Sequence, residues 1–536
     1  MSTSWKRQAR RFGAVTLAAA SCFAMSGFGT VEKSQADNAP FNVPKAVCGP
    51  GDHPETGLQG QVPAQLRATG FQGFSCNLEL ISQVRGDGAN WQSAEFRDAR
   101  LNGDNRFVPK AGQICAYHGT SFTTKDRTHV GVPVIDISDP ANPSTTSYLT
   151  TTSMLDPWES LKVNERRQLL AADNGHNAGG GPEVDIYDIS GDCRYPQFQS
   201  SVAVGKADGS TGEPAKVTGH EGSWAPDGLT YYGGDIFGSQ YYAVDMANPT
   251  APKLLATWHT GISGVHGLSI SDDGYRGYFV SLSGGVGAAN LNDPNAVATN
   301  GLLIYDLTQI QDRMPNPQPK LVGKVMWKDG SFAQHTIPVK IRGRHYVISV
   351  DEGGSAGIFG GVSGLQAACD AGFSAFPMAR IVDINDETNP RVISKLTLEI
   401  HNPANCAQVL PDLVGLSTFW YGSHYCSVDN RSNATTLACG YFNSGIRVFD
   451  IRNPQRPKEI AYYNPAGTTT ASPGSNHNRS GGWVAGGPDW CNAQIRLDVA
   501  TASLQTTCQD NGFLSLRFTN GAWPFPESST PPGLQN

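Results

Sequence analysis

The chain has 536 residues with a formal net charge of −7, and 61 of its residues are Gly and 34 are Pro. Gly and Pro together make about 18% of the chain, against about 12% in average proteins, which excludes a coiled coil or a mainly helical protein. The hydrophobic fraction of 39% is too high for a disordered chain, and the acidic balance argues against a nucleic-acid-binding protein. A turn-rich, all-β protein remains, either with several domains or as one large closed fold.

Residues 1–36 are predicted to be an export signal peptide. Basic residues at positions 6–11 precede an apolar stretch, and small residues near position 36 suit cleavage after Ala36. A transmembrane anchor is the alternative, but the apolar stretch is short and is broken by Gly and Ser. Arg10 and Arg11 also fit a twin-arginine signal. We therefore expect an exported protein, periplasmic or extracellular, without a membrane span.

The cysteines predict disulfide bonds. The chain has 11 Cys, and removal of Cys22 with the signal peptide leaves an even number that an oxidising compartment would allow to pair. The pairs Cys426/Cys439 and Cys491/Cys508 each flank a short hairpin-like stretch, so we expect these two bridges first. A metal site built from thiolates is disfavoured, because the chain has no CxxC pair.

One short pattern recurs along the chain: a turn with Gly, an apolar strand that ends near an Asp, and a turn with Pro. Its six copies contain Asp136, Asp188, Asp245, Asp306, Asp383 and Asp450. A degenerate seventh copy carries Arg517 at the Asp position. Repetition at this period is typical of propellers and other repeat architectures.

The repeated strings, such as GVPVIDISDPANP in the first copy and GIRVFDIRNPQRP in the sixth, resemble the LVIVD-repeat family. This resemblance covers the chain roughly from Cys76 to Pro524 and implies a β-propeller, without implying a set of functional residues. We predict a seven-bladed β-propeller over residues 74–524, with six or eight blades as alternatives. A linker at 37–73 would precede the propeller, and a Pro-rich tail at 525–536 would follow it.

Each repeat can be interpreted as a blade of four strands. In the third blade, the strands are predicted to be GSWAPDG, LTYYGGD, QYYAVDM and KLLATWH, from the innermost to the outermost. The stretch CNLELISQVRG, which begins at Cys76, is predicted to be a spare outer strand that completes the seventh blade. Closing the ring in this way removes exposed sheet edges.

Four histidines share one register, four residues before the central apolar residue of the innermost strand. They are His220, His266, His335 and His424 in the third to sixth blades, and the alignment places Glu159 and Asp489 there in the second and seventh blades. Equivalent positions in a propeller converge on its axis, and imidazole is a favoured ligand of copper and iron. We predict that the four histidines hold one transition metal ion, copper or iron. The alternative is a structural role, like that of the His in WD-repeat blades.

Long insertions are predicted on the face where this histidine ring opens, at residues 283–300 of the fourth blade and 352–377 of the fifth. Loops gathered on one face commonly mark the binding face of a repeat protein. Glu352 begins the second insertion and would lie near the same mouth. We predict Glu159, Glu352 and Asp489 as catalytic residues that orient ligands or move protons.

Two functions are compatible with this pattern. The favoured function is an exported metalloenzyme of the oxidoreductase or oxygenase type, which would act on a small-molecule substrate at the loop-covered mouth. The alternative is a non-catalytic periplasmic or cell-surface propeller that binds a protein, a glycan or a small ligand, because a propeller fold by itself implies no function.

Overall fold

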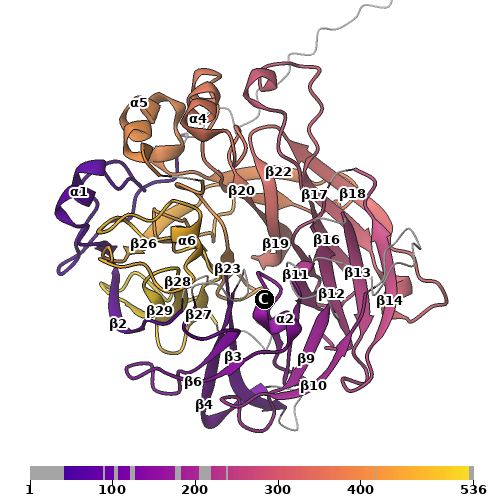
Figure 1. Ribbon diagram of the computed structural model, residues 1–536. Coiled ribbons are helices and arrows are strands. Elements are labelled where there is room, and N and C mark those ends of the chain that lie inside the picture. The colour runs from indigo at the N-terminus through magenta and orange to yellow at the C-terminus, as the bar shows by residue number, and fades with distance from the viewer. Residues whose placement is uncertain are drawn as a thin grey trace, which may run out of the picture. The chain divides into compact units, whose positions relative to one another are not determined.

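A computed structural model describes residues 42–87, 91–101, 107–120, 127–175, 183–204, 219–236, 239–262, 264–416 and 418–529. The described residues form seven antiparallel sheets that follow one another around a common centre, with the first strand of each sheet innermost (Figure 1). The prediction of an all-β, seven-bladed propeller is therefore confirmed. The predicted signal peptide at 1–36, with Cys22, lies outside the described residues.

The first four blades have four strands each. The first contains β3 (Gln92–Leu101), β4 (Phe107–Gly119), β5 (Val132–Asp136) and β6 (Ser144–Leu149). The second contains β7 (Lys162–Asn164), β8 (Leu169–Asp173), β9 (Val184–Asp188) and β10 (Gln197–Val202). The third contains β11 (Gly219–Trp224), β12 (Thr230–Asp235), β13 (Gln240–Asp245) and β14 (Lys253–His259). The fourth contains β15 (Leu268–Ile270), β16 (Arg276–Ser281), β17 (Asn300–Asp306) and β18 (Lys320–Trp327).

The last three blades include the two strands that begin the propeller in sequence. The fifth contains β19 (Ser331–Ile341), β20 (Arg344–Gly353), β21 (Ala379–Asp383) and β22 (Arg391–Leu396). The sixth contains β23 (Cys426–Val428), β24 (Thr436–Gly440), β25 (Ile446–Asp450) and β26 (Lys458–Asn464), and β1 (Phe74–Cys76) is its fifth strand. The seventh contains β27 (Arg496–Asp498), β28 (Ser503–Cys508), β29 (Gly512–Phe518) and β2 (Leu78–Val84).

The described α-helices are α1 (Ala64–Thr69), α2 (Thr152–Leu155), α3 (Thr308–Gln311), α4 (Gly361–Asp370), α5 (Cys406–Val409) and α6 (Asn476–Arg479).

The recurring Asp has the same structural role in six blades. Its Oδ1 accepts a hydrogen bond from the backbone N–H two residues later, at Ser138, Ser190, Ala247, Thr308, Asn385 and Arg452. Such Asx turns reverse the chain before the outer strand of the blade. In the seventh blade, Arg517 instead pairs with Glu79 of β2 at 2.6 Å.

The outer strand of every blade also has a recurring irregularity. The pairing of the third and fourth strands carries a β-bulge in all seven blades. In three blades a serine hydroxyl beside this bulge donates to a proline carbonyl of the next blade, at 2.5–2.6 Å: Ser82 to Pro140, Ser200 to Pro249, and Ser394 to Pro454. The turns that contain proline therefore also join neighbouring blades.

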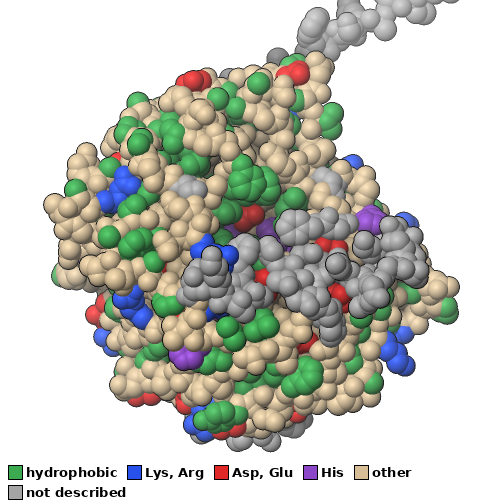
Figure 2. Space-filling view, in the orientation of Figure 1, with side chains coloured by type: hydrophobic (Ala, Val, Ile, Leu, Met, Phe, Trp, Pro, Cys, Tyr) green, Lys and Arg blue, Asp and Glu red, His purple; other side chains and the backbone are tan. Residues whose placement is uncertain are grey.

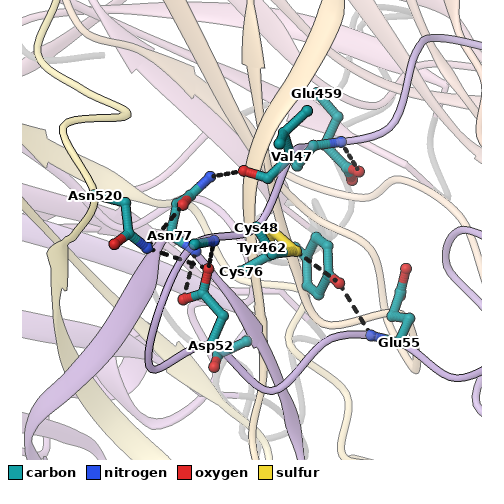
Figure 3. The surroundings of a disulfide bond; sticks show 12 residues. Val47, Cys48, Asp52, Glu55, Cys76, Asn77, Glu459, Tyr462 and Asn520 are labelled. Atoms are coloured by element: carbon teal, nitrogen blue, oxygen red, sulfur yellow. Dashed lines mark hydrogen bonds between the residues drawn. A yellow bond between two sulfur atoms is a disulfide. The ribbon is translucent and has the colours of Figure 1, made fainter.

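The N-terminal part of the described chain closes the ring. β2 pairs with β29, which confirms the predicted spare outer strand, and β1 pairs with β26 of the neighbouring sheet. Between β1 and β2, Asn77 adopts a φ of 57°, and its side chain donates to the carbonyls of Val47 and Ile460 at 2.9 and 2.8 Å (Figure 3). The disulfide Cys48–Cys76 ties the same segment to β1. The stretch from β1 to β2 thus links the sixth and seventh blades, because it adds a strand to each of them.

Residues 42–73, expected to be a linker, make specific contacts with the propeller. The backbone N–H of Val43 donates to the Thr397 carbonyl at 2.8 Å. The fully buried guanidinium of Arg447 lies between Glu459, at 3.0 Å, and Glu55 of this segment. The segment therefore supplies one of the two carboxylates that compensate a buried charge of the sixth blade.

Five disulfides use all ten cysteines from Cys48 onward. They are Cys48–Cys76, Cys115–Cys193, Cys369–Cys406, Cys426–Cys439 and Cys491–Cys508, so both predicted bridges are confirmed. This number of disulfides is typical of a protein that folds in an oxidising compartment, as exported proteins do. Within the described part of the chain, no helix has the length and apolar character needed to cross a membrane.

Candidate functional site

Five polar side chains meet where the innermost strands of the second to sixth blades lie closest to one another. Glu159 precedes β7, His220 is on β11, His266 precedes β15, His424 precedes β23, and Glu352 is on β20. Their side chains are between 0 and 10% exposed. Each comes from a different blade, so the ring geometry alone brings them together.

The carboxylate of Glu159 is the common partner of this cluster. Its Oε2 lies 3.6 Å from Nε2 of His220 and 3.4 Å from Nε2 of His266. Its Oε1 lies 2.9 Å from Nε2 of His424. The same Nε2 of His424 lies 3.2 Å from Oε2 of Glu352. Three imidazoles therefore face one carboxylate from three directions.

Backbone carbonyls fix the rings of two of these histidines. Nδ1 of His266 lies 3.2 Å from the Ala333 carbonyl, and Nδ1 of His424 lies 2.8 Å from the Asn492 carbonyl. A carbonyl oxygen accepts only, so Nδ1 carries the hydrogen in both rings and Nε2 is left to face the Glu159 carboxylate. Neither Nε2 makes a hydrogen bond of acceptable geometry. The Nε2 atoms and the Glu159 oxygens are buried acceptors that lie 2.9–3.4 Å apart. They require a positive charge between them, either a proton or a metal ion.

The ionisation of the cluster follows from this arrangement. Burial alone would raise the pKa of Glu159, but the positive charges of His424, His220 and His266 outweigh burial and hold that pKa well below its usual range. Burial would lower the pKa of His424, but the negative charges of Glu159 and Glu352 raise it to about 10. In the ion-free protein a proton therefore occupies the position where a metal ion could bind.

The ligand atoms also have the spacing that a metal ion needs. The ligand atoms of Glu159, His220 and His266 all lie within 4.8 Å of one another, and so do those of Glu159, Glu352 and His424. Imidazole and carboxylate ligands bind transition metals at about 2.0–2.2 Å, which places neighbouring ligand atoms about 3–3.5 Å apart. Small rotations of these side chains would complete such a shell. The residues present therefore fit a transition metal.

His335 lies outside this cluster, contrary to the sequence prediction. β19 carries a bulge between Ala333 and His335, so Gln334 faces the centre and its amide donates to Oε2 of Glu159 at 2.8 Å. His335 instead stacks on Tyr425 at 4.4 Å, and its Nε2 lies 3.2 Å from the backbone nitrogen of Cys426. β11 has the same bulge at His220, so the residue of β19 equivalent to His220 is Gln334, and the sequence alignment placed His335 one residue out of register.

Asp489 also lies away from the cluster. Its Oδ2 accepts hydrogen bonds from the backbone N–H groups of Asp510 and Asn511 at 2.9 and 2.7 Å. Its Oδ1 lies 3.6 Å from Nδ1 of His477, which is 3.1 Å from Oδ2 of Asp510. Asp489 therefore belongs to a second buried group, His477–Asp489–Asp510, under the long loop before β27.

Aromatic side chains that the sequence interpretation missed surround the histidines. The Trp158 ring lies 4.7 Å from the ring of His220, and the rings of Trp91 and Phe442 lie 5.4 and 5.1 Å from that of His424. Trp158 and Phe442 adopt φ values of 46° and 44°, a conformation that bulky residues rarely take and that is often held at functional sites. Trp91 directly precedes β3, the innermost strand of the first blade, and this position in the repeat is the sequence signal that could have identified it.

A second polar layer lies next to the cluster. The ammonium of Lys162 is 3.8 Å from Oε1 of Glu221 and 3.4 Å from the Tyr425 hydroxyl, and all three side chains are buried. Burial lowers the pKa of Lys162 to about 8, although Glu221 opposes this change. Glu221 and Tyr425 directly follow His220 and His424 in the sequence, and Lys162 contacts both of them. Buried polar side chains therefore continue from the cluster into the propeller.

Figure 2 shows histidine and acidic side chains in a hollow at the centre of the face that it draws, next to hydrophobic side chains. The insertions of the fourth and fifth blades contact each other, since the Asn292 side chain donates to the Ala371 carbonyl at 3.1 Å.

Comparisons with known proteins add no function. No family model matches the chain, so the resemblance to LVIVD repeats stays a prediction, and no curated protein is significantly similar to it. Among solved structures, one from Bacteroides uniformis, described as a candidate 6-phosphogluconolactonase, has a TM-score of 0.46 and 12% sequence identity. That likeness covers 79% of this chain and 95% of the other chain. At this level it carries no argument about function.

Proposed function

We propose that this protein is an exported metalloenzyme of the oxidoreductase type with a copper or iron ion at the mouth of the propeller. Glu159, His220 and His266 would hold the ion, with His424 and Glu352 on the other side of the Glu159 carboxylate. The observation that carries the proposal is the pair of buried Nε2 atoms, in His266 and His424, that face a carboxylate without hydrogen-bond geometry.

The donor set favours iron. Two histidines and one carboxylate on one side of an ion form the ligand set of many non-haem iron oxygenases, which leaves positions open for substrate and O₂. When bound, such an ion would supply Lewis-acid and redox chemistry.

The chain's own residues have distinct tasks in this proposal. The carbonyls of Ala333 and Asn492 hold the rings of His266 and His424 with Nε2 toward the centre. Gln334 fixes the orientation of the Glu159 carboxylate. Glu352, with a side chain 10% exposed, is the carboxylate of the cluster best placed to exchange a proton with a substrate at the mouth.

Metal analysis of two matched variants tests this proposal. His266→Gln and His335→Gln each replace one buried histidine, but only His266 faces Glu159. We expect stoichiometric copper or iron in the wild-type protein and in His335→Gln, and at least a tenfold loss of bound metal in His266→Gln, measured by inductively coupled plasma mass spectrometry.

Two results would contradict the proposal. The first is wild-type protein without stoichiometric metal after reconstitution, which would favour the non-catalytic ligand-binding propeller. The second is equal metal content in both variants. Circular dichroism would show that both variants are folded.

A further inference from the structure

The ligand atoms of the Glu159 cluster divide into two groups that share a single residue. Glu159, His220 and His266 form one group, and Glu159, His424 and Glu352 form the other. Oε2 of Glu159 faces the first group at 3.4–3.6 Å, and Oε1 faces His424 of the second at 2.9 Å. We propose that the centre binds two transition metal ions, bridged by the Glu159 carboxylate.

The geometry supports one ion on each side of Glu159. The two oxygens of one carboxylate point to different sets of ligands, as in a bridging carboxylate. Two-ion sites hold their ions about 3.5–4 Å apart, a separation that a bridging carboxylate can span. An ion beside Oε2 would leave His424 and Glu352 unused, although their ligand atoms lie 3.2 Å apart and their side chains are 0 and 10% exposed.

The charges of the cluster support the same arrangement. The carboxylates of Glu159, which is buried, and Glu352, which is 10% exposed, lie among three histidines. Within the described ranges, His424 is the only ion-pair partner of Glu352. Buried carboxylates need compensation by positive charge. Two divalent ions would compensate both carboxylates and satisfy Nε2 of His266 and His424, whereas one ion in the first group leaves the Glu352 carboxylate without a metal ion beside it.

The second ion would have a harder ligand set than the first. Its ligands are one imidazole and two carboxylates, which suit iron or manganese better than copper. The second site therefore favours iron among the metals proposed for this centre. This inference rests on the proposed function, because it adds an ion to the same centre.

Counting bound ions tests the inference. The full-length protein is stripped with a chelator and then titrated with Fe(II) without oxygen, and bound iron per chain is measured after gel filtration. We expect two iron ions in the wild-type protein and one in Glu352→Gln, a nearly isosteric change that removes a ligand of the second group alone. Asp489→Asn, in the separate His477 cluster, is the matched control and keeps two.

The possible results separate the inference from the proposed function. A wild-type protein that binds no iron overturns the inference, and it contradicts the proposed function as well if the same protein also binds no copper. A wild-type protein that binds one ion, with no loss in Glu352→Gln, overturns the second ion and leaves the proposed function standing. Loss of an ion in Asp489→Asn also overturns the inference, because the second ion would then lie in the His477 cluster. A melting curve of each variant shows whether it is folded.

Discussion

Two buried clusters of this protein have similar composition but different hydrogen bonding. The Glu159 cluster and the His477–Asp489–Asp510 cluster both place histidine and carboxylate atoms within 4.8 Å of one another. In the second cluster, backbone N–H groups donate to the carboxylates: those of Asp510 and Asn511 to Asp489, and that of Ser472 to Asp510. Nδ1 of His477 faces Asp510 at 3.1 Å.

The Glu159 carboxylate has a different set of neighbours. The Gln334 amide donates to its Oε2, while the Nε2 atoms of His266 and His424 face its two oxygens without hydrogen-bond geometry. A carboxylate supplied with backbone donors needs no further cation and anchors a loop. A carboxylate that faces the Nε2 atoms of imidazoles needs a positive charge beside it, either a proton on the imidazole or a metal ion. Hydrogen bonding, more than residue composition, therefore distinguishes a candidate metal centre from a structural cluster.

The largest effect is expected when Glu159 is changed to Gln. Glu159→Gln removes the shared oxygen ligand and its charge, so we expect complete loss of bound metal, measured by mass spectrometry on reconstituted protein. Asp489→Asn is the matched change in the other cluster and should leave the metal content unchanged. If the two variants kept or lost metal equally, the distinction between the clusters would be wrong.

A smaller effect, on stability, is expected for Asp489→Asn. Asn can keep an oxygen at the position of Oδ2, which accepts from the N–H groups of Asp510 and Asn511. Its amide group then replaces the acceptor Oδ1, which faces Nδ1 of His477 at 3.6 Å. The loss of a buried hydrogen-bond acceptor costs about 1–3 kcal/mol of unfolding free energy. Urea denaturation would measure this cost. An unchanged unfolding free energy would show that the cluster does not anchor the loop.

The smallest effect, on the pH dependence of stability, is expected from His401, a buried histidine that faces no carboxylate among the described residues. Nε2 of His401 donates to the Pro377 carbonyl at 2.8 Å, and its Nδ1 accepts from the Leu398 N–H at 3.0 Å. Burial lowers the pKa of His401 to about 4 despite these hydrogen bonds. Below pH 6.5 the unfolded chain binds a proton that the folded protein rejects, so stability falls as the pH drops toward 4. This pKa difference corresponds to about 1 kcal/mol between pH 6.5 and 5.5.

The variant His401→Gln isolates this contribution. Its unfolding free energy should fall less steeply between pH 6.5 and 5.5 than that of the wild-type protein, as measured by urea denaturation at both values. Equal pH dependence in the two proteins would show that His401 is not the buried neutral histidine described here.

Much of the fold could be predicted from the sequence because its signals are local and repeated. The Asp of each repeat closes an Asx turn through a backbone N–H two residues away, so the same short pattern marks six blades. The closing strand β2 could also be predicted, since it is a strand-like segment left over before the first repeat.

The candidate site could be predicted only in part. Glu159, His220, His266 and His424 lie together because equivalent positions in successive blades converge, and Glu352 joins them from the end of β20. The bulges of β11 and β19 leave no sign in the sequence, and they make Gln334, not His335, the equivalent of His220. Asp489 was aligned through Cys491, but the direction of its side chain depends on backbone groups at 510–511, which alignment does not show.

Anomalous X-ray scattering from crystals of the reconstituted protein tests the central claim most directly. Data collected at the iron and copper absorption edges locate each ion without any assumption about its ligands. We predict anomalous density beside the Glu159 carboxylate, within bonding distance of the histidine Nε2 atoms, and none between His477, Asp489 and Asp510. No density at Glu159, or density in the His477 cluster instead, would contradict the account.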